Sequence, residues 1–352
     1  MLDTFSQHGQ KILVTGGAGY VGSHTTLALL QAGADVVVLD NLHNSSVESL
    51  HRVARIAGRE PIFIRGDVRD RAVLETIFAE HSVCAVLHFA GLKAVGESAG
   101  APLIYYDNNV HGSQVLLQVM EQANVFCFVF SSSATVYGAP AQMPISETCP
   151  IGQLTNPYGR SKLVVEDMLR DLAASDSRWK LAILRYFNPV GAHESGLIGE
   201  DPKGVPNNLL PYICQVALGK RPFLTVFGND YPTRDGTCVR DYIHVVDLAD
   251  AHLCALKAIQ NRVGAHVWNL GTGMGYSVLD IVSAFEAASK RKVPYRTTAR
   301  RVGDVASCFA DSSKAEREID WKASCGLPEM MSDAWRWQIM NPNGYGDILG
   351  MV

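Results

Sequence analysis

The sequence predicts an α/β fold in which a doubly wound parallel sheet is followed by a smaller α/β C-terminal domain. Three observations carry this prediction. Short β-branched runs alternate with helical patterns through the first half, the expected strands are nearly continuous in apolar residues, and a glycine-rich turn follows the first strand. Parallel strands covered by helices on both faces produce this pattern.

The elements of the first half follow in a regular order. We expect strands at Lys11–Thr15, Asp35–Leu39, Pro61–Arg65, Cys84–Phe89 and Phe126–Ser131. We expect helices at Val21–Gln31, Arg71–Glu80, Pro102–Glu121 and Asn156–Leu172. Each strand is thus followed by a helix or a helical stretch, as in βαβ units.

The second half has a different character. From Asn188 to Gly236 the chain is rich in Pro, Gly and Asn, and helical patterns return at Tyr242–Ile259 and Val278–Ser289. We therefore predict one domain over residues 1–186 and a second over 187–352. Segments from about 237–272 are expected to return to the sheet of the first domain.

Composition excludes several classes of function. The chain has 352 residues, 47% apolar residues and a formal net charge of −4, so we expect neither nucleic acid nor a membrane as a partner. No apolar signal core or spanning run of about 20 apolar residues is present, which makes the cytoplasm the expected location. The eight cysteines form no Cys-x-x-Cys pair, so no metal site is expected, and most should be small buried residues.

The turn after the first strand predicts binding of a dinucleotide. It reads Gly16-Gly17-Ala18-Gly19-Tyr20-Val21-Gly22, and glycines there let the backbone approach a pyrophosphate at a helix N-terminus. Asp40 ends the second strand, where a carboxylate can accept hydrogen bonds from both ribose hydroxyls and repel a 2′-phosphate. The first domain is therefore expected to be of the Rossmann type, and the cofactor to be NAD rather than NADP.

A second group of residues predicts proton and hydride chemistry. Tyr158 and Lys162 are four residues apart, so they share one face of a helix if Pro157 begins it. A free tyrosine has a pKa of about 10, and neighbouring cations favour its phenolate form. Ser133, in a run of serines that ends the fifth strand, can hydrogen-bond both the tyrosine and a reacting oxygen.

Together these features resemble the extended short-chain dehydrogenase/reductase superfamily, and longer strings resemble its UDP-glucose 4-epimerase family. The strings are His88-Phe89-Ala90-Gly91-Leu92-Lys93-Ala94-Val95-Gly96-Glu97-Ser98, Ser131-Ser132-Ser133-Ala134-Thr135-Val136-Tyr137-Gly138, Leu184-Arg185-Tyr186-Phe187-Asn188-Pro189-Val190-Gly191-Ala192 and Val239-Arg240-Asp241-Tyr242-Ile243-His244-Val245. The resemblance extends over about residues 10–346.

The resemblance implies roles for individual residues. The expected catalytic residues are Ser133, Tyr158 and Lys162. The NAD contacts would be Gly16, Gly19, Tyr20, Val21, Gly22, Asp40, Asn41, Leu42, His43, Asn44, Ser45, Asp67, Val68, Phe89, Ala90, Gly91, Leu92, Lys93, Asn108, Tyr158, Lys162 and Phe187. The second domain would bind a UDP-hexose through Ser133, Tyr158, Asn188, Asn208, Leu209, Thr225, Val226, Phe227, Arg240, Arg301, Val302, Gly303, Asp304 and Cys308.

The activity implied is interconversion of UDP-glucose and UDP-galactose through a 4-keto intermediate, as an isomerase of galactose metabolism that keeps its NAD bound. Cys308 stands where family members restricted to these sugars usually carry tyrosine, which implies that UDP-GlcNAc and UDP-GalNAc are also substrates; a neutral packing role is the alternative. The resemblance also implies a homodimer.

Two alternatives to the epimerase remain. A nucleotide-sugar 4,6-dehydratase needs an Asp-Glu pair where Ala134 and Thr135 stand. A non-catalytic NAD-sensing protein would not need Ser133, Tyr158 and Lys162 together.

Overall fold

A seven-stranded parallel sheet forms the centre of the molecule. The computed structural model describes residues 9–140, 142–301 and 303–346. The sheet strands are β1 (Lys11–Thr15), β2 (Asp35–Asp40), β3 (Ile62–Arg65), β4 (Val83–His88), β5 (Cys127–Ser131), β6 (Lys180–Tyr186) and β10 (Gly264–Leu270). Their order is β10-β6-β5-β4-β1-β2-β3, and all neighbours are parallel.

The strand order reverses between β1 and β4. From β1 the chain runs outward to β3, then returns to the other side of β1 and continues through β4, β5, β6 and β10. In such sheets the carboxyl ends of the two central strands diverge into a crevice that binds ligands. The predicted doubly wound α/β fold is therefore confirmed, and its switch point lies at the ends of β1 and β4.

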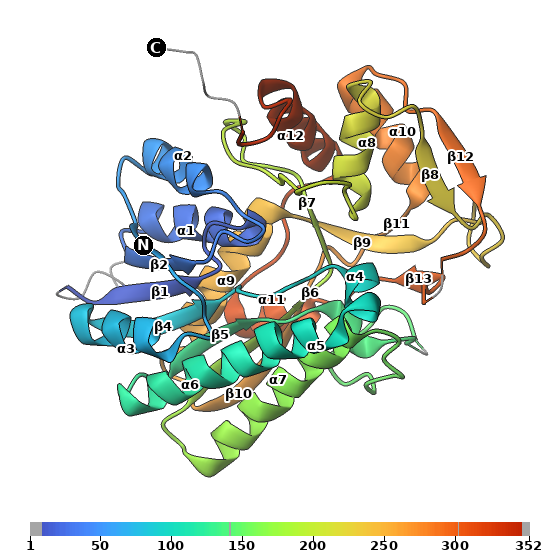
Figure 1. Cartoon of the computed structure of the whole chain (residues 1–352). Helices are drawn as coiled ribbons and strands as arrows, with labels where there is room; N and C mark the ends of the chain where they lie inside the picture. Colours follow the sequence, from blue (N-terminus) through green and yellow to red (C-terminus); the bar gives the residue numbers. More distant parts are fainter. Residues whose placement is uncertain (1–8, 141, 302, 347–352) are drawn as a thin grey trace.

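Helices cover both faces of this sheet (Figure 1). The helices α1 (Tyr20–Gln31), α2 (Val47–Ala57), α9 (Val245–Ile259) and α11 (Ser313–Ile319) share one apolar cluster with the sheet. The helices α3 (Arg71–Glu80), α6 (Gly112–Gln122) and α7 (Pro157–Ser175) share the cluster on the opposite face. Burial on both faces explains why the strands are almost continuously apolar.

Two short helices, α4 (Val95–Gly100) and α5 (Pro102–Tyr105), precede α6 and lie beside α7. A π-helical turn over Tyr106–His111 joins α5 to α6. The predicted helix Pro102–Glu121 is thus one helical run that contains a π-helical segment, which the apolar periodicity alone does not reveal.

The second lobe has its own smaller sheets and core. Its elements are β7 (Asn188–Val190), α8 (Leu209–Ala217), β8 (Leu224–Phe227), β9 (Val239–His244), β11 (Gly275–Ser277), α10 (Val278–Ser289), β12 (Tyr295–Thr298), β13 (Ser307–Cys308) and α12 (Leu327–Met340). The helices α8, α10 and α12 pack against β8 and β9 around buried Leu210, Phe285 and Met330. Figure 1 shows this lobe above the carboxyl ends of β5 and β6.

Two sequence predictions need correction. Tyr242 lies in β9 rather than in a helix, and α9 begins only at Val245. Tyr242 is buried in the apolar core of the second lobe, and strand pairing with β7 and β11 outweighed its helical periodicity. The sheet also takes β6 and β10, for which no strand was predicted. The division at residue 186 stays a prediction.

No helix within residues 9–140, 142–301 and 303–346 combines the length and apolar character needed to cross a bilayer.

Candidate active site

The glycine turn after β1 is shaped by close backbone packing. Gly16 has a φ of +73°, and a Cβ there would lie 2.6 Å from the Ala90 nitrogen at the end of β4. A Cβ at Gly22 would lie 2.2 Å from the Gly16 carbonyl oxygen. The N-terminus of α1 has no side-chain cap and no acidic residue in its first turn. Its free N–H groups and positive dipole end therefore suit the pyrophosphate of a dinucleotide.

Asp40 organises the loop that follows β2. Its carboxylate accepts hydrogen bonds from the Leu42 nitrogen at 2.9 Å, the Ser45 hydroxyl at 2.8 Å and the Ala18 nitrogen at 3.0 Å. Leu42 takes a φ of +60°, so this turn reverses sharply. Asp40 thus holds the pocket wall in shape, and its remaining lone pairs are the ones a ribose can use.

Most of the predicted cofactor residues line one pocket at the switch point. These are Gly16, Gly19, Tyr20, Val21, Gly22, Asp40, Asn41, His43, Asn44, Ser45, Val68, Phe89, Ala90, Gly91, Leu92, Lys93, Asn108, Tyr158 and Lys162. The residues Leu42, Asp67 and Phe187 do not line it. Asp67 forms an ion pair with Arg69 at 2.7 Å, which lowers the pKa of its carboxyl far below the usual value.

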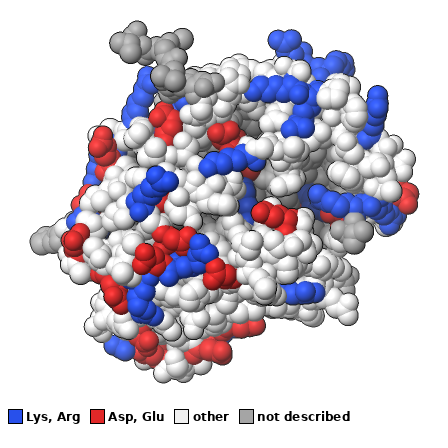
Figure 2. Space-filling model, in the orientation of Figure 1, with Lys and Arg blue, Asp and Glu red and all other residues white. Residues whose placement is uncertain are grey.

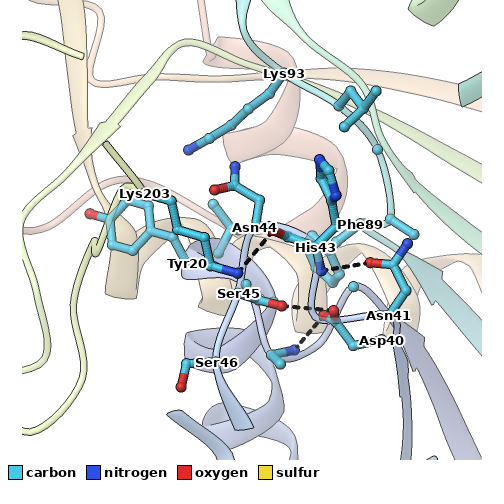
Figure 3. A pocket seen from close by; sticks show the side chains of 18 of the residues that line it. Tyr20, Asp40, Asn41, His43, Asn44, Ser45, Ser46, Phe89, Lys93 and Lys203 are labelled. Atoms are coloured by element: carbon cyan, nitrogen blue, oxygen red, sulfur yellow. Dashed lines mark hydrogen bonds between the residues drawn. The ribbon is translucent and has the colours of Figure 1, made fainter. Parts of the chain in front are cut away.

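The structure adds wall residues that the sequence did not suggest. They are Ala18, Leu39, Ser46, Gly66, Tyr186, Tyr345 and the segment 199–203. Within that segment Lys203 donates to the carbonyl oxygens of Leu42 and His43 at 3.0 and 2.9 Å. Figure 3 shows Lys203 reaching across to the loop that carries His43 and Asn44. No motif marks this segment, because its position depends on how the second lobe folds back.

Tyr158, Lys162 and Ser133 converge at the end of β5. The Lys162 ammonium donates to the Ser131 carbonyl at 2.8 Å and lies 4.8 Å from the Phe130 ring centroid. Tyr158 lies near the Ser133 side chain, and both residues are buried. The helix begins at Pro157 with an Asn156 cap, which places Tyr158 and Lys162 on one buried face as predicted.

Burial dominates the proton affinities of this group. It raises the pKa of the Tyr158 hydroxyl well above its usual value, while the hydrogen bond from Ser133 lowers it. It also lowers the pKa of the Lys162 ammonium to about 8, against the attraction of Glu166. The lowering of the tyrosine pKa that we expect from neighbouring cations is therefore opposed by desolvation.

The predicted diphosphate residues gather in the second lobe. Arg301 pairs with Asp304 at 3.1 Å, and its guanidinium lies 5.6 Å from the Phe227 ring centroid. Arg240 donates to the Val239 and Val305 carbonyls and lies 3.9 Å from the Asp304 carboxylate. Figure 2 shows blue Lys and Arg side chains around a hollow on this side of the molecule. Two arginines with a stacking ring provide charge and an aromatic surface for a nucleoside diphosphate.

The remaining predicted substrate residues lie on several elements of the second lobe. Asn188 begins β7, Asn208 and Leu209 begin α8, and Asn208 donates to Glu200 at 2.6 Å. Thr225 and Val226 lie in β8, but the Val226 side chain is buried in the core. Gly303 takes a φ of +88°. Val302 lies outside the described residues.

Cys308 connects the strand of the predicted diphosphate residue Arg240 with the apolar cluster after Ser133. It lies in β13, paired with Arg240 in β9. Its side chain packs against an apolar cluster that contains Phe187 and Ala134. Ala134 follows Ser133 in the chain. The thiol is mostly buried, which raises its pKa to about 11.

The chain matches the NAD dependent epimerase/dehydratase family over residues 12–271 and therefore belongs to it. It is similar to the UDP-glucose 4-epimerase of Pasteurella multocida, with 61% identity over 336 residues, 96% of this chain and 99% of the relative. These matches confirm the predicted resemblance, the prediction of an enzyme and NAD as the cofactor.

Two solved structures show the same fold. A UDP-glucose 4-epimerase from Bifidobacterium longum in complex with NAD⁺ and UDP is 53% identical, with a TM-score of 0.93, covering 95% of this chain and 99% of that one. One from Stenotrophomonas maltophila, with NAD and formylated UDP-arabinopyranose, is 52% identical, with a TM-score of 0.92, covering 94% and 98%.

The Lys203 contacts generate a prediction about cofactor retention. Lys203→Met removes two charge-assisted hydrogen bonds between the segment 199–203 and the loop after β2. Bound NAD should therefore dissociate faster, by on the order of tenfold. The measurement is NAD remaining on the protein over time in the presence of a scavenger. Lys314→Met is the matched control, because Lys314 also bonds a backbone carbonyl but does not line the pocket. Equal NAD loss in the two variants would refute this role.

Proposed function

We propose that this chain interconverts UDP-glucose and UDP-galactose by inverting the sugar 4-hydroxyl through a 4-keto intermediate. One observation carries the proposal. Tyr158 and Lys162 line the dinucleotide pocket, and Ser133 beside them adjoins the cluster that reaches Cys308 and the strand of Arg240. A sugar held between the arginines and the pocket would place its ring at the tyrosine. The similar proteins carry this activity in their names.

The residues divide the chemistry among them. NAD held by the pocket residues would supply the hydride acceptor and donor for the sugar carbon. Tyr158 takes the proton from the 4-hydroxyl and later gives it back, and Ser133 orients that oxygen by hydrogen bonding. The positive charge of Lys162, held at the end of β5, stabilises the phenolate.

Inversion requires the ketone to present its other face before the hydride returns. In this proposal Arg240 and Arg301 hold the diphosphate while the sugar turns about its bond to it. The cofactor is regenerated in each cycle and need not leave, which agrees with a pocket walled by the segment 199–203.

The alternatives fit the residues less well. Elimination of water by a dehydratase needs an acid and a base beside Ser133, but Ala134 is buried and apolar, and the Thr135 hydroxyl donates to Ser133 at 2.9 Å. A protein that only senses NAD does not need Tyr158 and Lys162, which are buried and line the pocket. The proposed enzyme would act in galactose metabolism in the cytoplasm.

Tyr158→Phe tests the role of the general base. It removes the hydroxyl but keeps the ring, so kcat for UDP-galactose should fall by a factor on the order of 10² or more. Fold and bound NAD should be unchanged, as checked by thermal unfolding and by NAD released on denaturation. A Tyr158→Phe enzyme with near-normal kcat would contradict the assignment.

We further propose that the enzyme accepts UDP-GlcNAc and UDP-GalNAc. Cys308 is paired with Arg240 and packs against the apolar cluster that includes Ala134, the residue after Ser133, so we expect its side chain to face the sugar. A thiol here occupies far less space than the tyrosine expected of narrower family members. The acetamido group needs about that difference in volume, so this wall sets the substrate range.

Cys308→Tyr should selectively remove the activity on N-acetylated sugars. The added ring fills the space for the acetamido group but leaves room for a hydroxyl. The measurement is kcat/KM for UDP-GlcNAc and UDP-glucose in both proteins, with Cys308→Ser as a control that adds no volume. The pocket argument fails if wild-type enzyme ignores UDP-GlcNAc, or if the tyrosine variant keeps both activities.

We also propose a homodimer formed through α5, α6 and α7. Leu103 and Ile104 on α5 are 80% and 58% exposed, and Val164 on the neighbouring α7 is also exposed. Large apolar side chains on adjacent helices favour helix packing against a second copy.

Leu103→Glu combined with Ile104→Glu should convert the dimer to a monomer. Two carboxylates in an apolar interface lose hydration without gaining partners. Sedimentation velocity measures the mass, and Ile339→Glu, at an exposed apolar position on α12, serves as the control. A wild-type monomer, or a double variant that stays dimeric, would place the interface elsewhere.

A further inference from the structure

The buried face of α7 carries a third polar residue beyond the catalytic pair. Tyr158, Lys162 and Glu166 are each four residues apart, so they lie along one side of the helix. Glu166 is fully buried, as are most of its neighbours on that face. A buried carboxylate is costly unless partners satisfy it, so its contacts should reveal why it is there.

Each of the three residues meets one residue of the serine run after β5. The Ser133 side chain lies near Tyr158 and lowers the pKa of its hydroxyl, and Lys162 donates to the Ser131 carbonyl at 2.8 Å. Ser132, between them, donates its hydroxyl to Glu166 at 2.6 Å. The helix and the strand end are therefore joined by three consecutive polar contacts. The middle contact fixes the backbone that carries the other two.

Glu166 is itself held rigidly from β6. Arg185 donates to both of its carboxylate oxygens, at 3.0 and 2.6 Å, and is almost fully buried. Arg170, one turn further along α7, donates at 2.7 Å. The Arg185 guanidinium also lies 4.8 Å from the ring centroid of Tyr137, in the turn that follows Ser133. The Glu166 carboxylate thus joins α7 to the end of β5 and to β6 by hydrogen bonds, and Arg185 extends these contacts to the turn of Tyr137.

Stability alone does not account for this arrangement. A buried ion pair costs much of its Coulombic gain in desolvation, and well-packed apolar residues often serve stability as well or better. The Glu166–Arg185 pair would also be complete without the Ser132 hydroxyl, because Arg185 and Arg170 already occupy both oxygens. The additional hydrogen bond from Ser132 restrains the backbone of the segment that also contains Ser131 and Ser133, next to Lys162 and Tyr158.

We propose that Glu166 is a positioning residue: through Ser132 it holds the Ser131 carbonyl against Lys162 and the Ser133 hydroxyl against Tyr158. The inference rests on the proposed epimerase function, in which these groups must meet the sugar 4-hydroxyl in one geometry. A small displacement of such groups lowers the rate of the chemical step more than it lowers substrate binding.

Ser132→Ala is the primary test, because it removes the middle contact and leaves the Glu166–Arg185 pair intact. The kcat for UDP-galactose should fall on the order of tenfold, while KM changes by less than about twofold. Bound NAD and the midpoint of thermal unfolding should stay close to wild type. A purely structural role predicts the opposite pattern, a lower unfolding midpoint with normal kcat and KM.

Glu166→Gln is the second variant, and Asp167→Asn is its matched control. Both change a carboxylate of α7 to an amide, but Asp167 is exposed and accepts a hydrogen bond from Arg170 at 2.7 Å, with no hydrogen bond to the serines after β5 among the described residues. Glu166→Gln should lower kcat at least as much as Ser132→Ala, measured per NAD-loaded enzyme, whereas Asp167→Asn should retain wild-type kcat. If Glu166→Gln does not fold, Ser132→Ala decides alone.

The outcomes separate this inference from the function on which it rests. Normal kcat and KM in Ser132→Ala, together with an inactive Tyr158→Phe, would overturn the positioning role and leave the epimerase assignment intact. A wild-type enzyme that does not interconvert UDP-galactose and UDP-glucose would remove the proposed function itself. A drop in kcat in Ser132→Ala that equals a drop in Asp167→Asn would also overturn the inference.

Discussion

The site depends on one close backbone contact, between the glycine turn after β1 and the end of β4. Gly16, at positive φ, touches Ala90, and Gly22 lies against the Gly16 carbonyl, so neither position has room for a Cβ. This contact sets α1 with its unsatisfied N–H groups at the place where the strand order reverses. The pocket lies at this contact, since Gly16, Gly22 and Ala90 line it together with Asp40, whose carboxylate shapes the loop after β2.

The charged side chains in the site are balanced by nearby partners, and the net charge of the whole chain has little bearing on them. The chain has a formal net charge of −4, yet Lys162 and Arg185 are buried beside the end of β5. Burial lowers the pKa of Lys162 and raises that of Tyr158, so desolvation works against the ionised form of each. For Lys162, the attraction of the Glu166 carboxylate offsets part of this cost. A centre built in this way is sensitive to small changes in geometry.

The two lobes are connected across the pocket by polar side chains. Glu200 accepts from Lys93 on the cofactor side at 3.0 Å and from Asn208 on the other at 2.6 Å. Lys203 fastens the same segment to the loop after β2. This wall of the pocket is therefore joined to the loop after β2 through Lys203 and to the start of α8 through Glu200.

Much of the first half could be predicted from sequence, because its signals are local. Apolar strands, the glycine turn, Asp40 at a strand end and the spacing of Tyr158 and Lys162 each act over a few residues or one helical turn. Tyr186, Lys203 and Tyr345 were missed as pocket residues, and Tyr242 was assigned to the wrong element, because their positions depend on how distant segments return. Glu166 gave no signal for the same reason: its partner Ser132 follows β5 and its partner Arg185 lies in β6, both well separated from Glu166 along the chain. The fold class and the residue types of the candidate centre could be predicted from the sequence, because periodicity and residue type are local properties of the chain. The side chains that close the pocket, and the partners of Glu166, could be seen only in the folded molecule, because their contacts join residues far apart in the chain.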